Sequence, residues 1–522
     1  MRAPYKRIIW VILDAAGYEL TRRCLKAGVC PALQTMAREG YLGPTLPSEP
    51  NCQTPPALRA LVAGTEPREN GIWGYLMPAG PARPGRSVSG FAVPPRGAAP
   101  LWEVLEQHGQ GYTLVNTVFR KDRAWARRAR AYDLLLDGYR HQRRRGGLIA
   151  LNPGGGRVRL PVPGMSLKLE QDGLRLFQAG RAPEALSPGE VRELRPNRRG
   201  GALLQWVGKS DCFVFPSSRV HLRLNPRLRS GIIKVPRSLM HGCLFRYARS
   251  REDLPPEQEM AIPERVTAQI GDLALQLTGT LPSRLFMIYF SLIDELSHTY
   301  LDQIEQSWPA GRGAEIARRS YALLDGYLGR IMEQADERTL VAVSSDHGQA
   351  PFRRVLKLNE LFFQAGLVRA DAGGYDFRRS EAYYHPADCG QVLANPHPTR
   401  RAGSEREKLA EKIEHCLQAA NSELDARLAW RRGEAADPYL CFVYPEADTH
   451  ITGKGSPGDD ILDCERRGGH HLSAYCPTPW IRSMLALWSP GGLRAAGPQP
   501  PQRNKELKSY LLACLGLAEE WG

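Results

Sequence analysis

Aspartate and histidine side chains gather at four places in this sequence, and these residue types are ligands that zinc favours in proteins. Each place adjoins an apolar run that a buried strand would supply. The residues are Asp14, the pair Asp294 and His298, the pair Asp346 and His347, and the neighbours His470 and His471. A single such residue is commonly a helix cap or a turn former. Four groups of this type in one chain instead favour a divalent metal site.

A fifth stretch offers a nucleophile. The sequence NCQTPPALRALVAG, residues 51–64, carries Cys52 and Thr54 just before a helix-like run that ends at Gly64. A cysteine thiol and a threonine hydroxyl both serve as nucleophiles in covalent catalysis when a base or a metal activates them. The stretch by itself leaves open which of the two attacks a substrate.

The elements that must position these residues alternate between apolar runs and amphipathic segments. We predict strands in the segments 7–17, 283–298, 338–348 and 480–492, and helices at 31–40, 56–64 and 315–335. Continuous apolar strands between amphipathic helices are typical of a parallel sheet covered on both faces. The sequence therefore predicts an α/β fold, a three-layer α/β/α sandwich around a mostly parallel sheet. Ligands of such sheets lie at the carboxyl ends of the strands.

Two regions interrupt this alternation. A chain of 522 residues exceeds what one hydrophobic core usually supports. Residues 120–263 are rich in Arg, Gly and Pro with short alternating segments, and residues 357–465 carry their own helix and strands. We predict a catalytic core from 1–119, 264–356 and 466–522. A basic cap subdomain is then inserted at 120–263 and a second insertion at 357–465.

The charge balance favours anionic partners. Lys and Arg total 70 against 55 Asp and Glu, a formal net charge of +15. Such a balance suits phosphate-containing small molecules, and it leaves nucleic acid as a less favoured partner. An arginine-rich run spans residues 120–145, where aromatic residues could stack a base. The simpler interpretation of this run is a solvated amphipathic helix with residues 134–136 facing inward.

Membrane and export signals are weak. No run approaches the roughly 20 apolar residues that span a bilayer, and the apolar run 8–13 is too short for a secretory signal. The eleven cysteines are irregularly spaced and form no CxxC pair. We therefore expect reduced thiols, a cytoplasmic protein and no membrane partner.

In their order along the chain, these motifs resemble the alkaline phosphatase superfamily, in particular its type I phosphodiesterase/nucleotide pyrophosphatase branch. Residues 345–348 match the family's SDHG in full, and Asp294 with His298 matches its D-x-x-x-H. The segment TPPALRALVAGTEPRENGI, residues 54–72, stands where the family has a nucleophile, a helix and TG..P..HGI. Asn70 replaces the family's histidine there, and Ala63 its threonine. The resemblance covers about half of the chain.

The resemblance implies that Thr54 is the nucleophile. The related sulfatases carry a modified cysteine ten residues before the glycine that ends this helix. Counting back from Gly64 gives Thr54, whereas Cys52 stands two residues too early. Leu58 also stands where the sulfatases have an arginine, which disfavours cleavage of sulfate esters.

The resemblance also implies two divalent metal ions, most simply Zn²⁺, with Mn²⁺ or Fe²⁺ as alternatives. Asp14, Asp346 and His347 would hold one ion with Thr54 beside it. Asp294 and His298 would hold the other together with His470 or His471, and His450 is a third candidate for that place.

The function that follows is a metal-dependent phosphohydrolase that cleaves a phosphodiester or a nucleotide-type phosphoanhydride through a phospho-threonine intermediate. The same core could instead hydrolyse phosphomonoesters or phosphonates, or transfer a phosphoryl group. An alternative of another class is a non-catalytic scaffold that binds nucleic acid, for which the positive charge is the argument.

Overall fold

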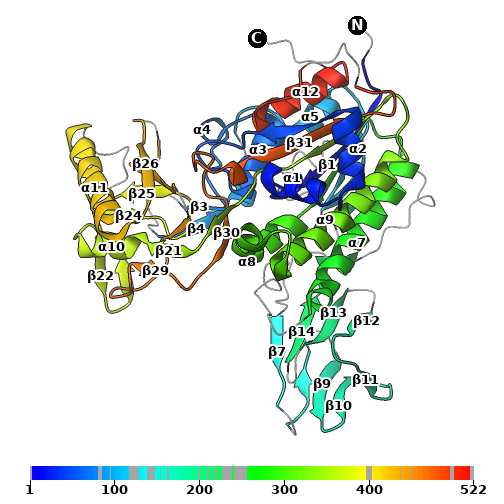
Figure 1. Ribbon diagram of the computed structural model, residues 1–522, viewed down its shortest axis with the longest axis horizontal. Coiled ribbons are helices and arrows are strands. Elements are labelled where there is room, and N and C mark those ends of the chain that lie inside the picture. Colours follow the sequence, from blue (N-terminus) through cyan, green and yellow to red (C-terminus); the bar gives the residue numbers. More distant parts are fainter. Residues whose placement is uncertain are drawn as a thin grey trace.

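One large sheet forms the centre of the molecule, and two lobes project from it (Figure 1). This computed structural model describes residues 3–79, 85–93, 96–116, 129–137, 147–152, 155–160, 164–197, 200–207, 211–216, 218–219, 221–225, 238–239, 255–395, 403–435, 437–446, 448–493 and 499–517.

The main sheet has eight strands. In spatial order they are β16 (His221–Leu224), β6 (Tyr132–Asp137), β5 (Tyr112–Val115), β18 (Leu285–Phe290), β1 (Arg7–Leu13), β19 (Thr339–Ser344), β31 (Ser483–Trp488) and β2 (Tyr41–Thr45). The five strands from β6 to β19 are parallel to their neighbours, and β16, β31 and β2 pair antiparallel at the two edges. The prediction of a mostly parallel sheet is confirmed.

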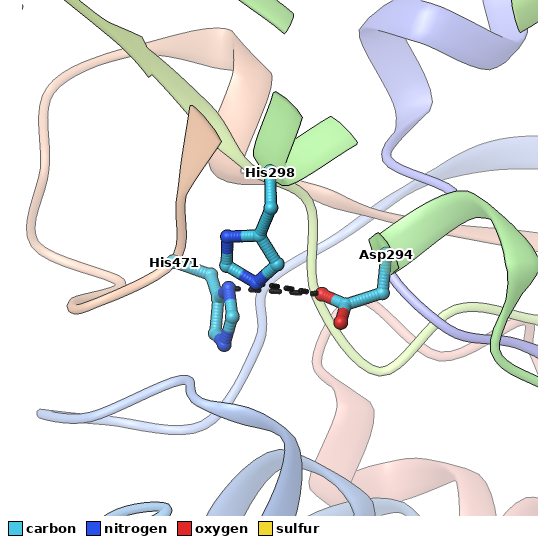
Figure 2. A group of neighbouring side chains, drawn as sticks. All are labelled: Asp294, His298 and His471. Carbon is cyan, nitrogen blue, oxygen red and sulfur yellow. Dashed lines mark ion pairs between the residues drawn. The ribbon is translucent and has the colours of Figure 1, made fainter. Parts of the chain in front are cut away.

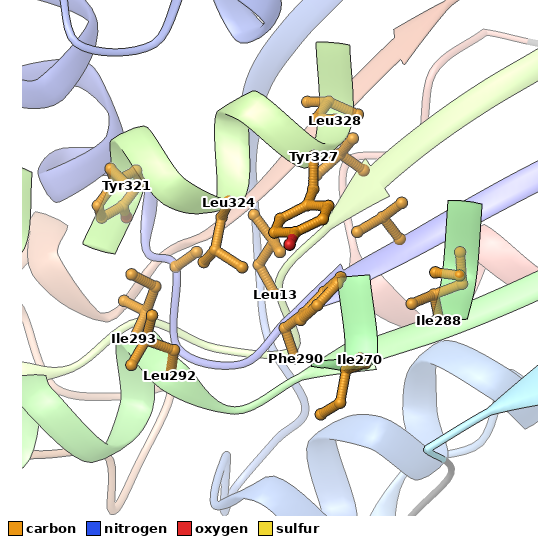
Figure 3. Packing of buried hydrophobic residues seen from close by; sticks show 14 of the residues in the cluster. Leu13, Ile270, Ile288, Phe290, Leu292, Ile293, Tyr321, Leu324, Tyr327 and Leu328 are labelled. Atoms are coloured by element: carbon orange, nitrogen blue, oxygen red, sulfur yellow. The ribbon is translucent and has the colours of Figure 1, made fainter. Parts of the chain in front are cut away.

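Alternate residues of each central strand enter two separate cores. In β1, Ile9 and Val11 pack into one hydrophobic cluster, whereas Ile8 and Trp10 pack into another on the opposite face. Figure 3 shows the first of these cores, where residues of the long helices meet the ends of β1 and β18. Because successive side chains of a strand point to opposite faces, a strand buried on both sides is apolar throughout, as these are.

Helices cover both faces, which confirms the three-layer α/β/α sandwich. On one face lie α1 (Tyr18–Lys26), α2 (Pro31–Glu39), α7 (Pro256–Thr280), α8 (Leu292–Ser307) and α9 (Gly311–Met332). On the other lie α3 (Thr54–Ala63), α5 (Leu101–Gln107) and α12 (Leu507–Cys514).

The first lobe contains two four-stranded sheets with a small core of their own. One consists of β7 (Gly147–Ala150), β12 (Val191–Asn197), β13 (Gly200–Val207) and β14 (Asp211–Pro216), and the other of β8 (Val158–Arg159), β9 (Met165–Glu170), β10 (Gly173–Gln178) and β11 (Glu184–Leu186). Strands β6 and β16 also fall within residues 120–263, yet they pair in the main sheet. The domain boundaries drawn from the sequence stay a prediction.

The second lobe combines a four-stranded sheet with two helices around a third core. Its sheet consists of β24 (Ala382–Tyr384), β25 (Gln391–Ala394), β27 (Cys441–Pro445) and β26 (Leu428–Arg432), and its helices are α10 (Leu358–Gln364) and α11 (Gly403–Leu424).

Shorter elements connect these parts of the chain. They are α4 (Pro67–Asn70), β3 (Leu76–Pro78), β4 (Ser87–Ser89), β15 (Ser218–Arg219), β17 (Ser238–Leu239), β20 (Ala350–Phe352), β21 (Arg354–Lys357), β22 (Arg369–Asp371), β23 (Gly374–Asp376), β28 (Thr449–Thr452), β29 (Leu462–Asp463) and β30 (Gly468–His470).

Two local predictions were wrong. Within residues 283–298, predicted as one strand, the strand β18 ends at Phe290 and helix α8 begins at Leu292. Residues 134–136 lie in the buried strand β6 and not in an amphipathic helix, because they extend the main sheet beside β5. Most of the arginine-rich run 120–145 lies outside the described residues.

A search of the helices in the described residues finds none with the length and apolar character needed to cross a membrane.

Candidate active site

Three neighbouring strands of the main sheet deliver most of the predicted site residues to one place. Strand β1 pairs in parallel with both β18 and β19, so the carboxyl ends of all three strands lie at the same edge. Asp14 follows β1 directly, and Asp346 and His347 follow β19. After β18 the chain turns into α8, whose first two turns carry Asp294 and His298.

Thr54, Asp14, Asp346 and His347 converge on one point, and we call them the inner group. The Nε2 atom of His347 lies 3.3 Å from Thr54 Oγ1, 3.3 Å from Asp14 Oδ1 and 3.4 Å from Asp346 Oδ2. All four residues are buried, and His347 has no exposed surface. The structure therefore brings together four residues from three places that lie far apart in the sequence.

The loops that carry the inner group are held closely together. The backbone N–H of Ala15 donates to Asp346 Oδ1 over 3.2 Å, and Asn504 Nδ2 donates to the backbone carbonyl of Asp346 over 2.6 Å. A Cβ atom on Gly17 would lie only 2.9 Å from the Cα of Gly348. These contacts fix the two loops relative to each other, so the carboxylates have little freedom to separate.

Thr54 is the first residue of α3. Two prolines follow it, which a helix tolerates at this position because the first-turn N–H groups have no intrahelical partner. The helix ends at Gly64, which adopts a left-handed conformation with φ 71°. Because Thr54 is held at the start of a wholly buried helix, its hydroxyl has a defined direction toward His347.

Cys52 is placed differently from Thr54. Its side chain is fully buried, and its thiol donates to the backbone carbonyl of His471 over 3.3 Å. Burial raises the pKa of this thiol well above its usual value, which disfavours the reactive thiolate. The geometry therefore favours Thr54 as the nucleophile.

Asp294, His298 and His471 form a second cluster, which we call the outer group (Figure 2). Asp294 Oδ1 lies 3.5 Å from His298 Nε2 and 3.8 Å from His471 Nδ1. Asp294 and His298 are one helical turn apart, so both side chains leave the same face of α8. His471 arrives from the segment that follows β30.

Two glycines allow β30 to lie directly against α8. A Cβ atom on Gly469 would lie 2.6 Å from the carbonyl oxygen of Ser297, and one on Gly468 would collide with the carbonyl oxygen of His298. The same contact lets the Nδ1 atom of His298 donate to the carbonyl of Gly469 over 2.9 Å. The approach of β30 therefore sets the positions of His298 and His471 together.

The inner and outer groups are adjacent. The rings of His347 and His471 stack with their centres 4.2 Å apart. Asp294 also offers an oxygen within 4.8 Å of ligand atoms of Asp14 and His347. The two groups thus form one continuous cluster of carboxylates and imidazoles.

The structure separates the three histidines that the sequence left as alternatives. His471 joins the outer group, whereas the side chain of His470 lies beside Phe352 and His450 on the other side of β30. Neighbouring residues of a strand point to opposite faces, which explains why only one of the pair reaches Asp294.

The tautomers of two histidines suit metal binding. The Nδ1 atom of His347 lies 3.0 Å from the carbonyl oxygen of Gly348, and that of His298 lies 2.9 Å from the carbonyl oxygen of Gly469. A carbonyl only accepts, so each Nδ1 carries the proton. In the neutral imidazole, Nε2 then presents a lone pair toward the carboxylates, as metal-ligating histidines do when their other nitrogen is hydrogen-bonded.

Charge and spacing in the cluster also fit divalent cations. Asp14 Oδ1, Asp346 Oδ2 and His471 Nδ1 are buried and have no hydrogen-bond partner among the described residues. Burial, Asp346 and Asp294 raise the pKa of Asp14 well above its usual value, because these carboxylates repel one another. Atoms that share a tetrahedral ion at 2.0–2.1 Å lie roughly 3.3 Å apart, close to the separations within the inner group.

Two further residues support the cluster without any signal in the sequence. The hydroxyl of Tyr289, a residue of β18, donates to Asp14 Oδ2. Gln349 Nε2 donates to Asp294 Oδ1 over 2.6 Å. Tyr289 belongs to an apolar strand and Gln349 follows the SDHG motif, so residue type alone does not distinguish them. Such partners orient ligating carboxylates.

A cavity of about 840 Å³ opens beside the outer group. Its walls include His298, His471 and Gln53, and it extends toward β28 and the segment before β30. Gln53 precedes Thr54 and donates through Nε2 to the carbonyl of Asp388 in the second lobe over 3.0 Å. A substrate in this cavity would therefore lie between the main sheet and the second lobe.

Comparison with known proteins agrees with the motifs. A family model described as type I phosphodiesterase / nucleotide pyrophosphatase matches residues 8–470. No curated protein matches. Among solved structures, phosphonoacetate hydrolase from Sinorhizobium meliloti 1021 in complex with phosphonoformate shows 12% identity and a TM-score of 0.47, covering 99% of this chain and 98% of that one. Murine ectonucleotide pyrophosphatase / phosphodiesterase 5 shows 12% identity and a TM-score of 0.48, covering 98% and 95%.

Proposed function

Because the chain belongs to the type I phosphodiesterase / nucleotide pyrophosphatase family, and is thus a hydrolase of phosphate ester bonds, we propose that it acts through a phospho-threonine intermediate on Thr54. The observation that carries the proposal is the position of the Thr54 hydroxyl, 3.3 Å from the Nε2 atom of His347 and beside two buried carboxylates.

We propose that the inner group and the outer group each hold one divalent cation, most simply Zn²⁺. When bound, the two ions would supply positive charge that favours the alkoxide of Thr54 and offsets the charge on the leaving oxygen. Mn²⁺ or Fe²⁺ suits similar ligands.

The residues of the chain direct two displacement steps. In the first, Thr54 Oγ1 gives its proton to water and forms a bond to phosphorus, and the leaving oxygen departs with the electron pair of the broken P–O bond. In the second, a water oxygen bonds to phosphorus, Thr54 Oγ1 leaves with the electron pair of its P–O bond, and one proton of the attacking water returns to Thr54. Placement of Thr54 at the start of α3 fixes the direction of attack, which is the orientation effect that lowers such barriers.

We propose a phosphodiester or a nucleotide-type phosphoanhydride as the substrate class, on the strength of the family. Phosphomonoesters, phosphonates or phosphoryl transfer remain alternatives on the same core, and they differ in what the cavity must hold. The scaffold alternative loses its basis, because membership of a hydrolase family accompanies a complete set of candidate catalytic residues.

We propose a cytoplasmic location on the basis of the cysteines. The ten cysteines within the described residues are all free thiols, and most are buried. Reduced thiols are typical of cytosolic proteins.

The test compares hydrolysis of bis(p-nitrophenyl) phosphate and p-nitrophenyl phosphate. Purified protein is assayed as isolated, after chelation and after addition of Zn²⁺, beside Thr54→Ala and Thr54→Ser. We expect activity that Zn²⁺ restores, that favours the diester, that falls at least ~10³-fold in Thr54→Ala and that partly survives in Thr54→Ser. Preference for the monoester would move the assignment to a phosphatase. Absence of bound metal by elemental analysis would contradict the mechanism.

A further inference from the structure

We propose that the cavity beside the outer group receives the leaving group of the substrate, and that this leaving group carries a negative charge of its own, as a carboxylate or a phosphate. The inference rests on the proposed function, because it assigns a substrate class to the same site. The cavity of about 840 Å³ begins at His298 and His471 and extends to Arg466 and Arg467.

The cavity lies on the side toward which a leaving group would depart. Thr54 contacts His347, the ring of His347 stacks on His471, and the cavity begins at His471 and His298. An in-line displacement sends the leaving oxygen away from the attacking one. With Thr54 Oγ1 attacking from the inner group, the bond that breaks points toward the outer group and the cavity behind it. Gln53 lines the near end of the cavity, so the space is continuous with the surroundings of Thr54.

Two arginines line the cavity. Arg466 and Arg467 are exposed, and neither makes an ion pair with any residue that the structure describes. Both immediately precede β30, which carries the chain to His471.

The other charges of the lining are mostly paired. Lys454 Nζ lies 3.0 Å from Asp388 Oδ2, and Asp302 Oδ1 accepts from Arg353 over 2.7 Å. Glu465 is the remaining acid of the lining and is exposed. Two guanidinium groups therefore face one carboxylate, and an incoming anion would complete the balance. Guanidinium groups bind carboxylates and phosphates through two parallel hydrogen bonds.

Aromatic rings also line the cavity. Phe352 and His450 lie with ring centres 5.1 Å apart, and His450 and His470 lie 5.8 Å apart. Both ring nitrogens of His470 and Nδ1 of His450 are buried without a hydrogen-bond partner among the described residues. A neutral imidazole can donate one N–H to an anion while its face packs on an organic group. An organic leaving group with an anionic end matches this wall.

The test uses three methyl aryl phosphodiesters that differ only at the para position of the leaving phenol: carboxymethyl, carbamoylmethyl and phosphonomethyl. The methylene insulates the phenol from the charged group, so the chemical leaving ability stays similar. We expect kcat/KM for the carboxymethyl or the phosphonomethyl ester to exceed that for the neutral amide about 10-fold at low salt. The larger of the two ratios distinguishes a carboxylate from a phosphate.

The double variant Arg466→Gln/Arg467→Gln should reduce these ratios to near 1 while leaving kcat/KM for the amide within about threefold. The matched control is Arg38→Gln, an exposed arginine on α2 that should change neither ratio. Equal kcat/KM for acid and amide in the unmodified protein, or ratios that the double variant leaves unchanged, would overturn the inference.

A binding measurement separates failure of this inference from failure of the proposed function. Calorimetric titration of Thr54→Ala protein with 4-hydroxyphenylacetate and with 4-hydroxyphenylacetamide requires no turnover. We expect about 10-fold tighter binding of the anion, lost when the two arginine changes are added. If no ester is hydrolysed but this difference persists, the proposed function fails and the anion site stands. If hydrolysis depends on Thr54 but the two compounds bind equally, the inference fails alone.

Discussion

The inner and outer groups hold similar ligand types in different surroundings. The side chains of Asp14, Asp346 and His347 are at most 3% exposed, and loops at the ends of neighbouring strands carry them. In the outer group, Asp294, His298 and His471 are 14%, 22% and 9% exposed, and they come from a helix and a distant returning segment.

This difference separates two tasks. The inner group is enclosed by the main sheet, where Thr54 is held in one direction and water has little access. The outer group borders the cavity, where groups of different shape can be admitted. A fixed nucleophile and an adaptable leaving-group side are what one core needs in order to serve several substrates, since specificity lies in what surrounds the core.

The sharpest test of this comparison replaces one histidine from each group. We expect His347→Ala to lower kcat/KM at least ~10³-fold and to lower the free energy of unfolding by about 2–4 kcal/mol, because a fully buried side chain is removed. His471→Ala should lower kcat/KM about 10²-fold or more with a smaller loss of stability. Urea unfolding and steady-state kinetics measure both effects.

The matched control for His471→Ala is His470→Ala. Elemental analysis should find one metal per chain in His471→Ala and two in His470→Ala, because only His471 faces Asp294. Loss of a metal from His470→Ala would reverse this assignment.

Acid should weaken the second lobe. His385 is fully buried there, and its ring contacts the backbone carbonyl of Arg86. Burial lowers its pKa to about 4 from 6.5. The unfolded chain therefore binds more protons between these values, and stability present above pH 6.5 is lost as the pH falls toward 4. The difference in pKa corresponds to about 3 kcal/mol.

Urea unfolding at pH 7 and pH 4.5 checks this expectation. His385→Asn should flatten the acid loss of stability, because the asparagine does not titrate. An equal acid loss in the variant and the unmodified protein would place the sensitive group elsewhere.

Replacing a residue that supports one of the two groups should moderately lower the affinity of that group for its metal. Gln349→Leu removes the hydrogen bond to Asp294. We therefore expect the metal of the outer group to bind about 10-fold to 100-fold more weakly. Tyr289→Phe removes the hydroxyl that donates to Asp14 and should affect the other metal instead. Competition with a chromogenic chelator measures both affinities. Identical effects of the two variants would show that the groups do not act separately.

The smallest effect is expected at Cys52. Cys52→Ala should leave kcat/KM within about threefold and cost about 1 kcal/mol of stability, because the thiol is buried and donates to the backbone carbonyl of His471. A loss of activity comparable to that of Thr54→Ala would make the cysteine the nucleophile.

Residue pattern was sufficient to predict the sandwich and the gathering of Asp14, Asp346 and His347, because apolar strands and the residues that follow them depend on local sequence. It was insufficient to choose between His470 and His471, since that choice depends on which face of β30 meets α8. The same limit applies to Asn504. Its side chain holds the Asp346 loop, although the two residues lie 158 positions apart in the chain. Long-range contacts of polar residues have no periodic signal. The helical start of α8 was missed because Leu292 and Ile293 continue the apolar run of β18 past Ser291, so the change from strand to helix has no polar boundary.

The glycine pair at β30 allows the second lobe to vary without disturbing the ligands. About 170 residues separate His298 from Gly468, yet the close approach of Gly468 and Gly469 to α8 restores one fixed alignment where the chain returns. The length and shape of the intervening segment do not enter this alignment. The requirement that this contact places on the second lobe is therefore local: its last segment must return as Gly-Gly-His-His against the same helix.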